Sequence, residues 1–280
     1  MKSSTLRRVV LGLGGYSVGL GLIVGGLMLM RPPPPKNPAA SRRLVQAILH
    51  NDTAEVKAAL KAGADPNDEM EGSSWSDLVH PITNAMKGDR DQHLYDTALL
   101  LTMDCLVKRD PKAVNPQNKD IPLENLATVK ALVEAGADVN ARNRIGNTPL
   151  AMAVSWGYDD TAHFLLEHKA NPNLALDGGS TPCSDAAAGG DPKLVKDLLL
   201  HGANPNAIDI LGMTPLFMAA LPPETPQQVE IVKLLLQFHA DRSVKDKTGM
   251  TALAHAQKDN RTGIAKLLQQ TGAQPHVPSP

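Results

Sequence analysis

The fold is decided by the stretch Glu134-Ala135-Gly136-Ala137-Asp138-Val139-Asn140, which is followed shortly by Gly146-Asn147-Thr148-Pro149-Leu150. Copies of the first motif share a final asparagine and lie at residues 61–67, 168–173 and 201–206. Copies of the second motif share a glycine two residues before a threonine and lie at residues 179–183, 212–216 and 249–253. Asn140, Asn173 and Asn206 are 33 residues apart, so the chain consists largely of one repeated unit of that length.

Each position of the unit has a conformational role. The glycine of the second motif permits a positive φ, the threonine caps a helix, and the proline occupies the first helical position, where its missing N–H costs little. Gly157 and Gly190 are expected to end the short first helix, and Asn51 and Asn260 take that place in the terminal units. A leucine-rich second helix follows, as in residues 194–200. One helix pair cannot bury both of its faces, so the units must stack into an all-α solenoid of about five to six units.

This pattern resembles the ankyrin-repeat family, whose unit is a β-turn followed by two antiparallel helices. The resemblance covers about residues 41–275 and is strongest over 126–273. It implies a protein-binding module with a concave recognition face and no catalytic activity. The family often carries histidine after Thr-Pro-Leu, where it bonds the threonine and its neighbours. In this chain the place is taken by Ala151, Ser184, Phe217 and Ala254, so that polar network is expected to be absent.

The period is broken at two places. Asn206 to Ser243 is 37 residues, and a proline-rich loop at 221–226 supplies the four extra residues between two helices. Asn67 to Asn140 is 73 residues, or two periods plus seven. For this irregular segment, residues 68–123, we expect one expanded and one truncated repeat. Its expected helices cover about 81–86 and 92–107, and a further helix lies near 127–135.

The first forty residues differ from the repeats. A short basic tail at 1–8 precedes 22 uncharged, mostly apolar residues at 9–30, which are long enough for one transmembrane helix. A cleavable signal peptide is the alternative, but its apolar region is usually shorter and ends in a small-residue cleavage site. Residues 31–40 are rich in proline and predict a stiff spacer. Residues 276–280 are expected to be a disordered tail.

The predicted membrane helix raises the questions of direction and self-association. Basic residues flank it on both sides, but a very short basic leader favours a cytoplasmic N-terminus, which in a bacterium places the repeats in the periplasm. Ser17, Gly21 and Gly25 form a small-residue face that could support a homodimer, although glycine is common in membrane helices. The expected localisation is therefore a single-pass membrane protein with an extracytoplasmic body.

Composition offers no site for chemistry or nucleic acid. Residues 1–40 hold five basic residues and no acidic residue, which leaves 23 basic against 29 acidic residues in the remainder. That balance does not favour binding of phosphate backbones. Cys105 and Cys183 form no metal-type pair, and His168, His201 and His239 recur in separate units. The sequence predicts no enzyme activity, no cofactor and no metal site.

The residues left free of core packing predict a protein-binding face. Residues on the turn tips and at the exposed end of the first helix are not needed for core packing. The candidate partner-binding residues among them are Arg144, Ile145, Trp156, Ile210, Leu211 and Met213. Exposed apolar residues near a tryptophan are typical of an interface hot spot. The alternative is that these residues pack locally under the tips.

The sequence is compatible with three functions. The first is a membrane-tethered module that binds a protein partner as an adaptor, scaffold or inhibitor. The second is an architectural, self-associating membrane protein without a specific partner. The third is an enzyme hidden in residues 68–123, but the polar residues there show no motif spacing.

Overall fold

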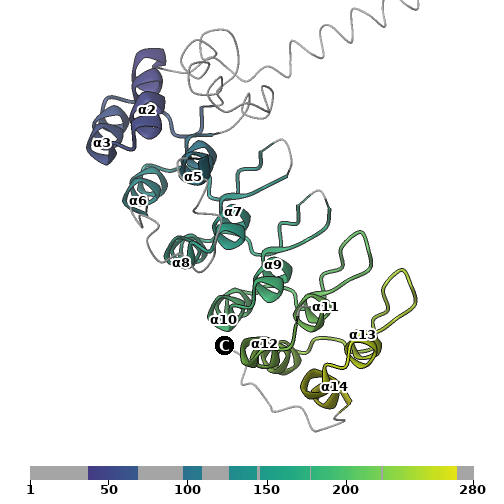
Figure 1. The fold of residues 1–280 in the computed structure, drawn as a ribbon. Coiled ribbons are helices and arrows are strands. Elements are labelled where there is room, and N and C mark those ends of the chain that lie inside the picture. Colours follow the sequence, from purple (N-terminus) through teal and green to yellow (C-terminus); the bar gives the residue numbers. More distant parts are fainter. Residues whose placement is uncertain are drawn as a thin grey trace, which may run out of the picture. The chain divides into compact units, whose positions relative to one another are not determined.

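The computed structural model describes residues 37–68, 97–108, 126–143, 146–176, 178–221 and 223–269. The regular structure of these residues is entirely α-helical and comes in consecutive pairs (Figure 1). In chain order the pairs are α2 (Pro38–His50) and α3 (Thr53–Lys61), α5 (Ala98–Lys108) and α6 (Leu126–Glu134), α7 (Pro149–Trp156) and α8 (Asp159–Glu167), α9 (Pro182–Gly189) and α10 (Pro192–Leu200), α11 (Pro215–Ala220) and α12 (Pro226–Gln237), and α13 (Ala252–Lys258) and α14 (Thr262–Gln269).

The predicted caps form at the first helices. The Oγ1 atoms of Thr148, Thr181 and Thr251 each accept a hydrogen bond from the backbone N–H three residues later, at 3.1–3.3 Å. Thr214 is the exception, since its buried hydroxyl has no partner among the described residues. At the far end of α7, Gly157 has a φ of 71°, which is the left-handed conformation that ends the helix.

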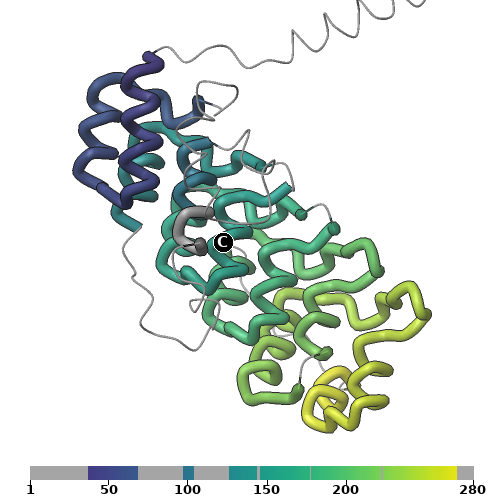
Figure 2. The backbone as a smooth tube through the Cα atoms, turned by 45° about the horizontal axis from the view of Figure 1, so that its top comes forward, coloured from purple at the N-terminus to yellow at the C-terminus, as the bar shows by residue number. Residues whose placement is uncertain are grey.

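The pairs stack in chain order. Each first helix packs against the first helices before and after it, so that α7 lies between α5 and α9. The second helices form a parallel series in which α8 lies between α6 and α10. Figure 2 shows the helices following one another in the order of the sequence. The predicted solenoid is thereby confirmed, with six helix pairs in the described residues.

One leucine position of the second helix recurs in the buried core of consecutive units. Its members are almost completely buried and are Leu132, Leu165, Leu198, Leu235 and Leu268. They occupy equivalent positions in α6, α8, α10, α12 and α14, where each contacts the buried faces of its neighbours. Because each fills space between two units, replacing one by alanine is expected to cost about 2–5 kcal/mol.

The repeated asparagine joins each unit to the next. The Nδ2 atom of Asn173 donates to the carbonyl of Gly202 at 2.8 Å, and its Oδ1 atom accepts from the backbone N–H of Asn204 at 2.7 Å. Asn140 and Asn206 make the same pair of contacts to the following units. This asparagine ladder explains why the residue recurs with the period of the repeat: it pairs backbone groups that the second helix leaves free at its C-terminal end.

Asn67 corrects the prediction for the irregular segment. It bonds directly to Gly136 and Asp138, at 2.8 and 2.7 Å, as the other ladder asparagines bond to their next unit. The helix α5 packs against both α2 and α7, and pairs with α6. The expectation of one expanded and one truncated repeat is therefore wrong. A single expanded repeat spans this interval, and its first helix is Ala98–Lys108. The helix expected at 81–86 lies outside the described residues.

The four-residue insertion lies between α11 and α12, as the repeat spacing predicts. It also makes hydrogen bonds to the last unit. The carboxylate of Glu224 accepts hydrogen bonds from the backbone N–H groups of Gly263 and Ile264 at 3.2 and 3.1 Å. These N–H groups belong to the first turn of α14, which has no other partner for them within its own helix. The extra residues thus supply a helix cap across two units.

The described helices are all too short or too polar to cross a membrane. The segment predicted to do so, residues 9–30, lies outside the described residues, as do the basic tail 1–8, residues 31–36 of the predicted spacer and the tail 276–280. Residues 38–40, predicted to belong to the spacer, instead form the first turn of α2, where Asn37 is the N-cap and Pro38 takes the first helical position.

Candidate protein-binding surface on the fingers

A tight turn precedes the first helix in each of the last four units. We call these turns fingers and define them as residues 143–147, 176–180, 209–213 and 246–250. In each, the N–H of the first residue donates to the carbonyl of the fifth, and the N–H of the glycine donates to the carbonyl of the first, at 2.7–3.0 Å. The finger glycines have φ values of 75–81°. Figure 1 shows these connections projecting on one side of the first helices.

Neighbouring fingers are bonded to one another. The N–H of Ile210 donates to the carbonyl of Gly178 at 3.1 Å, and the N–H of Lys247 donates to the carbonyl of Leu211 at 3.0 Å. The backbones approach so closely that a Cβ on Gly179 would lie 3.0 Å from the Cα of Asp209. The fingers 176–180, 209–213 and 246–250 therefore form one connected surface.

The largest exposed apolar side chains of this surface belong to finger 209–213 and the residue before it. Ile208, Ile210 and Leu211 are 58%, 61% and 51% exposed. Ile210 and Leu211 are predicted site residues that the structure places at the surface. Ile208 was missed, although its alternation with Ile210 in the sequence Ile-Asp-Ile is the pattern of an extended segment that presents both side chains on one side.

The other predicted site residues have different surroundings. Met213 and Trp156 are half-buried and pack against the core, as the local-packing alternative requires. Arg144 and Ile145 lie outside the described residues. The large exposed apolar side chains of the described finger surface are therefore Ile208, Ile210 and Leu211.

A polar bridge lies beside Trp156. Asp185 of α9 accepts hydrogen bonds from Ser180 of the finger at 2.5 Å and from Ser155 of α7 at 3.4 Å. Burial raises the pKa of Asp185, while the two serine hydroxyls lower it. This carboxylate fixes the finger relative to two first helices, and it was not among the residues predicted from the sequence.

The last finger contains a polar network centred on Asp246. Asp246 is buried, and its carboxylate accepts from the N–H and hydroxyl of Thr248, the N–H of Met250 and Nε2 of His255. The hydrogen bonds from Thr248 and then His255 hold the pKa of Asp246 well below its usual range. This histidine stands one position later than in the family pattern, at 255 in place of 254, so the network around Asp246 differs from the one that the family pattern describes.

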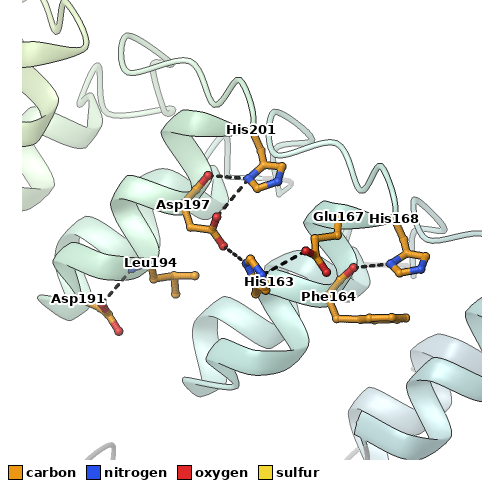
Figure 3. Close-up of polar contacts among 8 residues, drawn as sticks. All are labelled: His163, Phe164, Glu167, His168, Asp191, Leu194, Asp197 and His201. Atoms are coloured by element: carbon orange, nitrogen blue, oxygen red, sulfur yellow. Dashed lines mark hydrogen bonds and ion pairs between the residues drawn. The ribbon is translucent and has the colours of Figure 1, made fainter. Parts of the chain in front are cut away.

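A second polar cluster lies on the second helices, away from the fingers (Figure 3). His163 of α8 contacts Asp197 of α10 at 2.8 Å, and His201 contacts the same carboxylate at 3.2 Å. The hydrogen bond that His163 donates to the Asp197 carboxylate is the main cause that raises the pKa of His163. Among the described residues no group of His, Cys, Asp and Glu has the arrangement of a metal site. The contact between His163 and Asp197 joins α8 and α10 of two consecutive units.

Comparisons with known proteins agree with this architecture. The family model described as "Ankyrin repeats (3 copies)" matches residues 96–175 and 184–279. Among solved structures, an ankyrin repeat domain from Acinetobacter baumannii AYE has a TM-score of 0.63 and 26% sequence identity, covering 80% of this chain and 95% of that one.

Two curated mouse proteins are similar over parts of the chain. Rabankyrin-5 is 29% identical over 168 residues, which is 55% of this chain and 11% of the relative. Protein phosphatase 1 regulatory subunit 27 is 45% identical over 53 residues, which is 19% of this chain and 34% of the relative. The chain thus spans only a minor part of either relative. The family match extends over more than half of the chain and coincides with the stacked helix pairs, the fingers and the asparagine ladder. The chain belongs to the ankyrin repeat family.

Proposed function

We propose that this chain binds a partner protein through the finger surface formed by Ile208, Ile210 and Leu211. Ankyrin repeats bind protein partners, and one relative is named a regulatory subunit of a phosphatase, which fits such a role. The observation on which the proposal rests is that three large apolar side chains, each more than half exposed, lie on finger 209–213 or directly before it, and that this finger is hydrogen-bonded to both of its neighbours. Apolar groups on a preorganised backbone lose little entropy on binding.

The other residues of the predicted binding face have secondary roles in this proposal. Met213 and Trp156, which pack against the core, are expected to support the exposed residues, and Arg144 and Ile145 of finger 143–147 are proposed to extend the binding face. No step requires a catalytic residue, a metal or a cofactor.

Photo-crosslinking in cells tests this assignment and identifies the partner. A benzoylphenylalanine placed at position 211 is expected to form a defined adduct with one protein. The same group at position 200 is the matched control, because Leu200 is 63% exposed at the end of α10 and lies outside the fingers. Equal adducts from both positions would show that the finger surface is not the site.

We further propose that residues 9–30 tether this module to a membrane, with the repeats on the extracytoplasmic side. Support comes from the 22 uncharged residues between basic flanks. Deletion of residues 1–36 should move the protein from the membrane fraction to the soluble fraction. A chain that is recovered without residues 1–36 from wild-type cells would support the signal-peptide alternative instead.

The alternative function, an architectural and self-associating membrane protein, is supported by the small-residue face of Ser17, Gly21 and Gly25. It predicts a homodimer that Gly21→Ile and Gly25→Ile abolish, and no heterologous adduct at position 211. The two functions are therefore separated by the same crosslinking experiment.

A further inference from the structure

Backbone hydrogen bonds link neighbouring fingers, and among the described residues this series of bonds stops at the last finger. The carbonyl groups of Gly178 and Leu211 each accept an N–H from the following finger. The equivalent carbonyl in the last finger belongs to Thr248, and among the described residues no backbone N–H donates to it. An open backbone edge of this kind is a template for pairing with another extended chain.

The space beside this edge is open as well. A Cβ added to Gly179 or Gly212 would lie 3.0–3.2 Å from the backbone of the following finger. At Gly249 the same atom would meet no described atom within 4 Å, although the φ of 81° equals that of Gly212. The last finger therefore has the same backbone conformation as finger 209–213, but no described residue occupies the space where a following finger would lie.

The charged residues near this edge indicate what kind of segment could bind there. Lys247 on the last finger and Lys245 directly before it are exposed, and within the described part of the chain neither forms an ion pair. The acidic residue between them, Asp246, is buried and fully engaged by Thr248, Met250 and His255. The edge thus combines the Thr248 carbonyl, which accepts no described backbone N–H, with two exposed cations that precede it in the sequence, and this combination complements an extended segment with acidic side chains. Residues 270–280 of this chain contain no acidic residue and do not have this complementarity.

We propose that the partner protein adds an extended, acidic segment to the outer edge of finger 246–250, with one of its N–H groups donating to the Thr248 carbonyl. This mode of binding is β-strand addition, in which backbone bonds give affinity and side chains give selectivity. The inference rests on the proposed function, because the segment continues the surface that begins at Ile210 and Leu211.

The test uses the full-length chain and a fluorescent peptide of alternating Glu and Val, with binding followed by anisotropy. A Lys-Val peptide controls for charge, and a Glu-Val peptide with alternate N-methyl groups controls for backbone donation. The key variant is Gly249→Asn, because asparagine tolerates the left-handed φ while its side chain fills the neighbour's place. Gly157→Asn is the matched control, since Gly157 has a φ of 71° and open space but caps α7.

Wild type and Gly157→Asn should bind the acidic peptide alike, while Gly249→Asn, the Lys-Val peptide and the N-methylated peptide should each raise Kd about tenfold, or ~1.4 kcal/mol. Lys245→Glu with Lys247→Glu should raise Kd to a similar extent. Thermal unfolding of the two asparagine variants at equal midpoints shows that both are folded.

Several results would overturn the proposal. Equal binding by Gly249→Asn and Gly157→Asn would show that the edge is not used. Binding only after removal of residues 270–280 would assign the edge to the chain's own tail, and self-association lost in Gly249→Asn would assign it to a second copy. If Leu211→Asp loses the crosslinked partner while Gly249→Asn retains it, the proposed function stands and strand addition is wrong. If neither variant loses the partner, both proposals fail.

Discussion

The Nε2 atom of His255 lies 2.7 Å from the Oδ2 atom of Asp246, and this contact joins the last finger to the helix that follows it. Asp246 also accepts two backbone N–H groups of the finger, so one carboxylate orders both the turn and its connection to α13. The last finger is thus ordered by Asp246 and by its contact with His255 of the helix that follows it, α13.

The first prediction concerns the pH dependence of this contact. The pKa of Asp246 is lowered in the folded state, so the stabilisation is present above the unfolded pKa of about 3.9 and is lost as pH falls through the lower folded value. Asp246→Ala should lower the urea midpoint at pH 7 and flatten the loss of stability below pH ~4. An unchanged midpoint at pH 7 would show that the carboxylate does not order the finger.

The second prediction concerns the asparagine ladder. Asn173→Ala removes two hydrogen bonds to the next unit and leaves the N–H of Asn204 without its partner. We expect a loss of about 1–3 kcal/mol in the free energy of unfolding, measured by urea denaturation. Ser243→Ala is the control, because Ser243 holds the equivalent position in the last described unit, where the described residues give it hydrogen bonds within its own turn to Asp241. It should change stability by less than about 0.5 kcal/mol.

The third prediction separates backbone strain from close approach. Gly179→Ala and Gly249→Ala impose the same strain, since their φ values are 79° and 81°. Only the Cβ at position 179 would collide with the next finger, at 3.0 Å from Asp209. Gly179→Ala should therefore be the more destabilising variant by about 1–3 kcal/mol. Equal losses in paired denaturation curves would mean that the fingers separate at little cost.

The fourth prediction concerns a pair of carboxylates at the starts of α8 and α10. Burial, followed by the charge of Asp191, raises the pKa of Asp159 to about 6. A raised carboxyl pKa means that the folded state binds the proton more tightly, so stability falls as pH rises from about 4 to about 6. Asp159→Asn should remove this fall and be more stable than wild type at pH 7. Parallel pH profiles for the two proteins would contradict the assignment.

The fifth prediction concerns Glu224. Its carboxylate caps α14 from a loop two helices away, so Glu224→Gln should weaken the last unit by about 1 kcal/mol. Hydrogen exchange should accelerate at the N–H groups of Gly263 and Ile264. Glu230→Gln, which loses only an exposed contact to Lys233, should leave that exchange unchanged.

Most of the fold could be predicted because its determinants are local. The threonine caps, the glycines at helix ends and the leucine stripe of the second helix each act within about a dozen residues of sequence, so a 33-residue period reports them directly. The asparagine ladder shows the same period, although its function as a bond between units needed the structure. The family resemblance rested on these features and is confirmed.

The errors arose where partners are distant in sequence. The length of the interval after Asn67 suggests two repeats, whereas the bonds to Gly136 and Asp138 show a single expanded repeat. The cap from Glu224 to α14 spans 39 residues and has no local signature. Ile208 and His255 were overlooked for a simpler reason, since the family pattern directed attention to neighbouring positions. The burial of Trp156 and Met213 depends on packing between units, which the pattern does not specify.

The central claim is that this chain binds a protein partner through finger 209–213. The most direct measurement is the affinity of the crosslinked partner for wild type, for Ile210→Asp combined with Leu211→Asp, and for Leu200→Asp. We expect the double variant to raise Kd by about tenfold or more, because two apolar contacts are replaced by buried charges, while Leu200→Asp leaves Kd unchanged. Equal affinity for all three proteins, each with a wild-type unfolding midpoint, would show that finger 209–213 does not bind the partner.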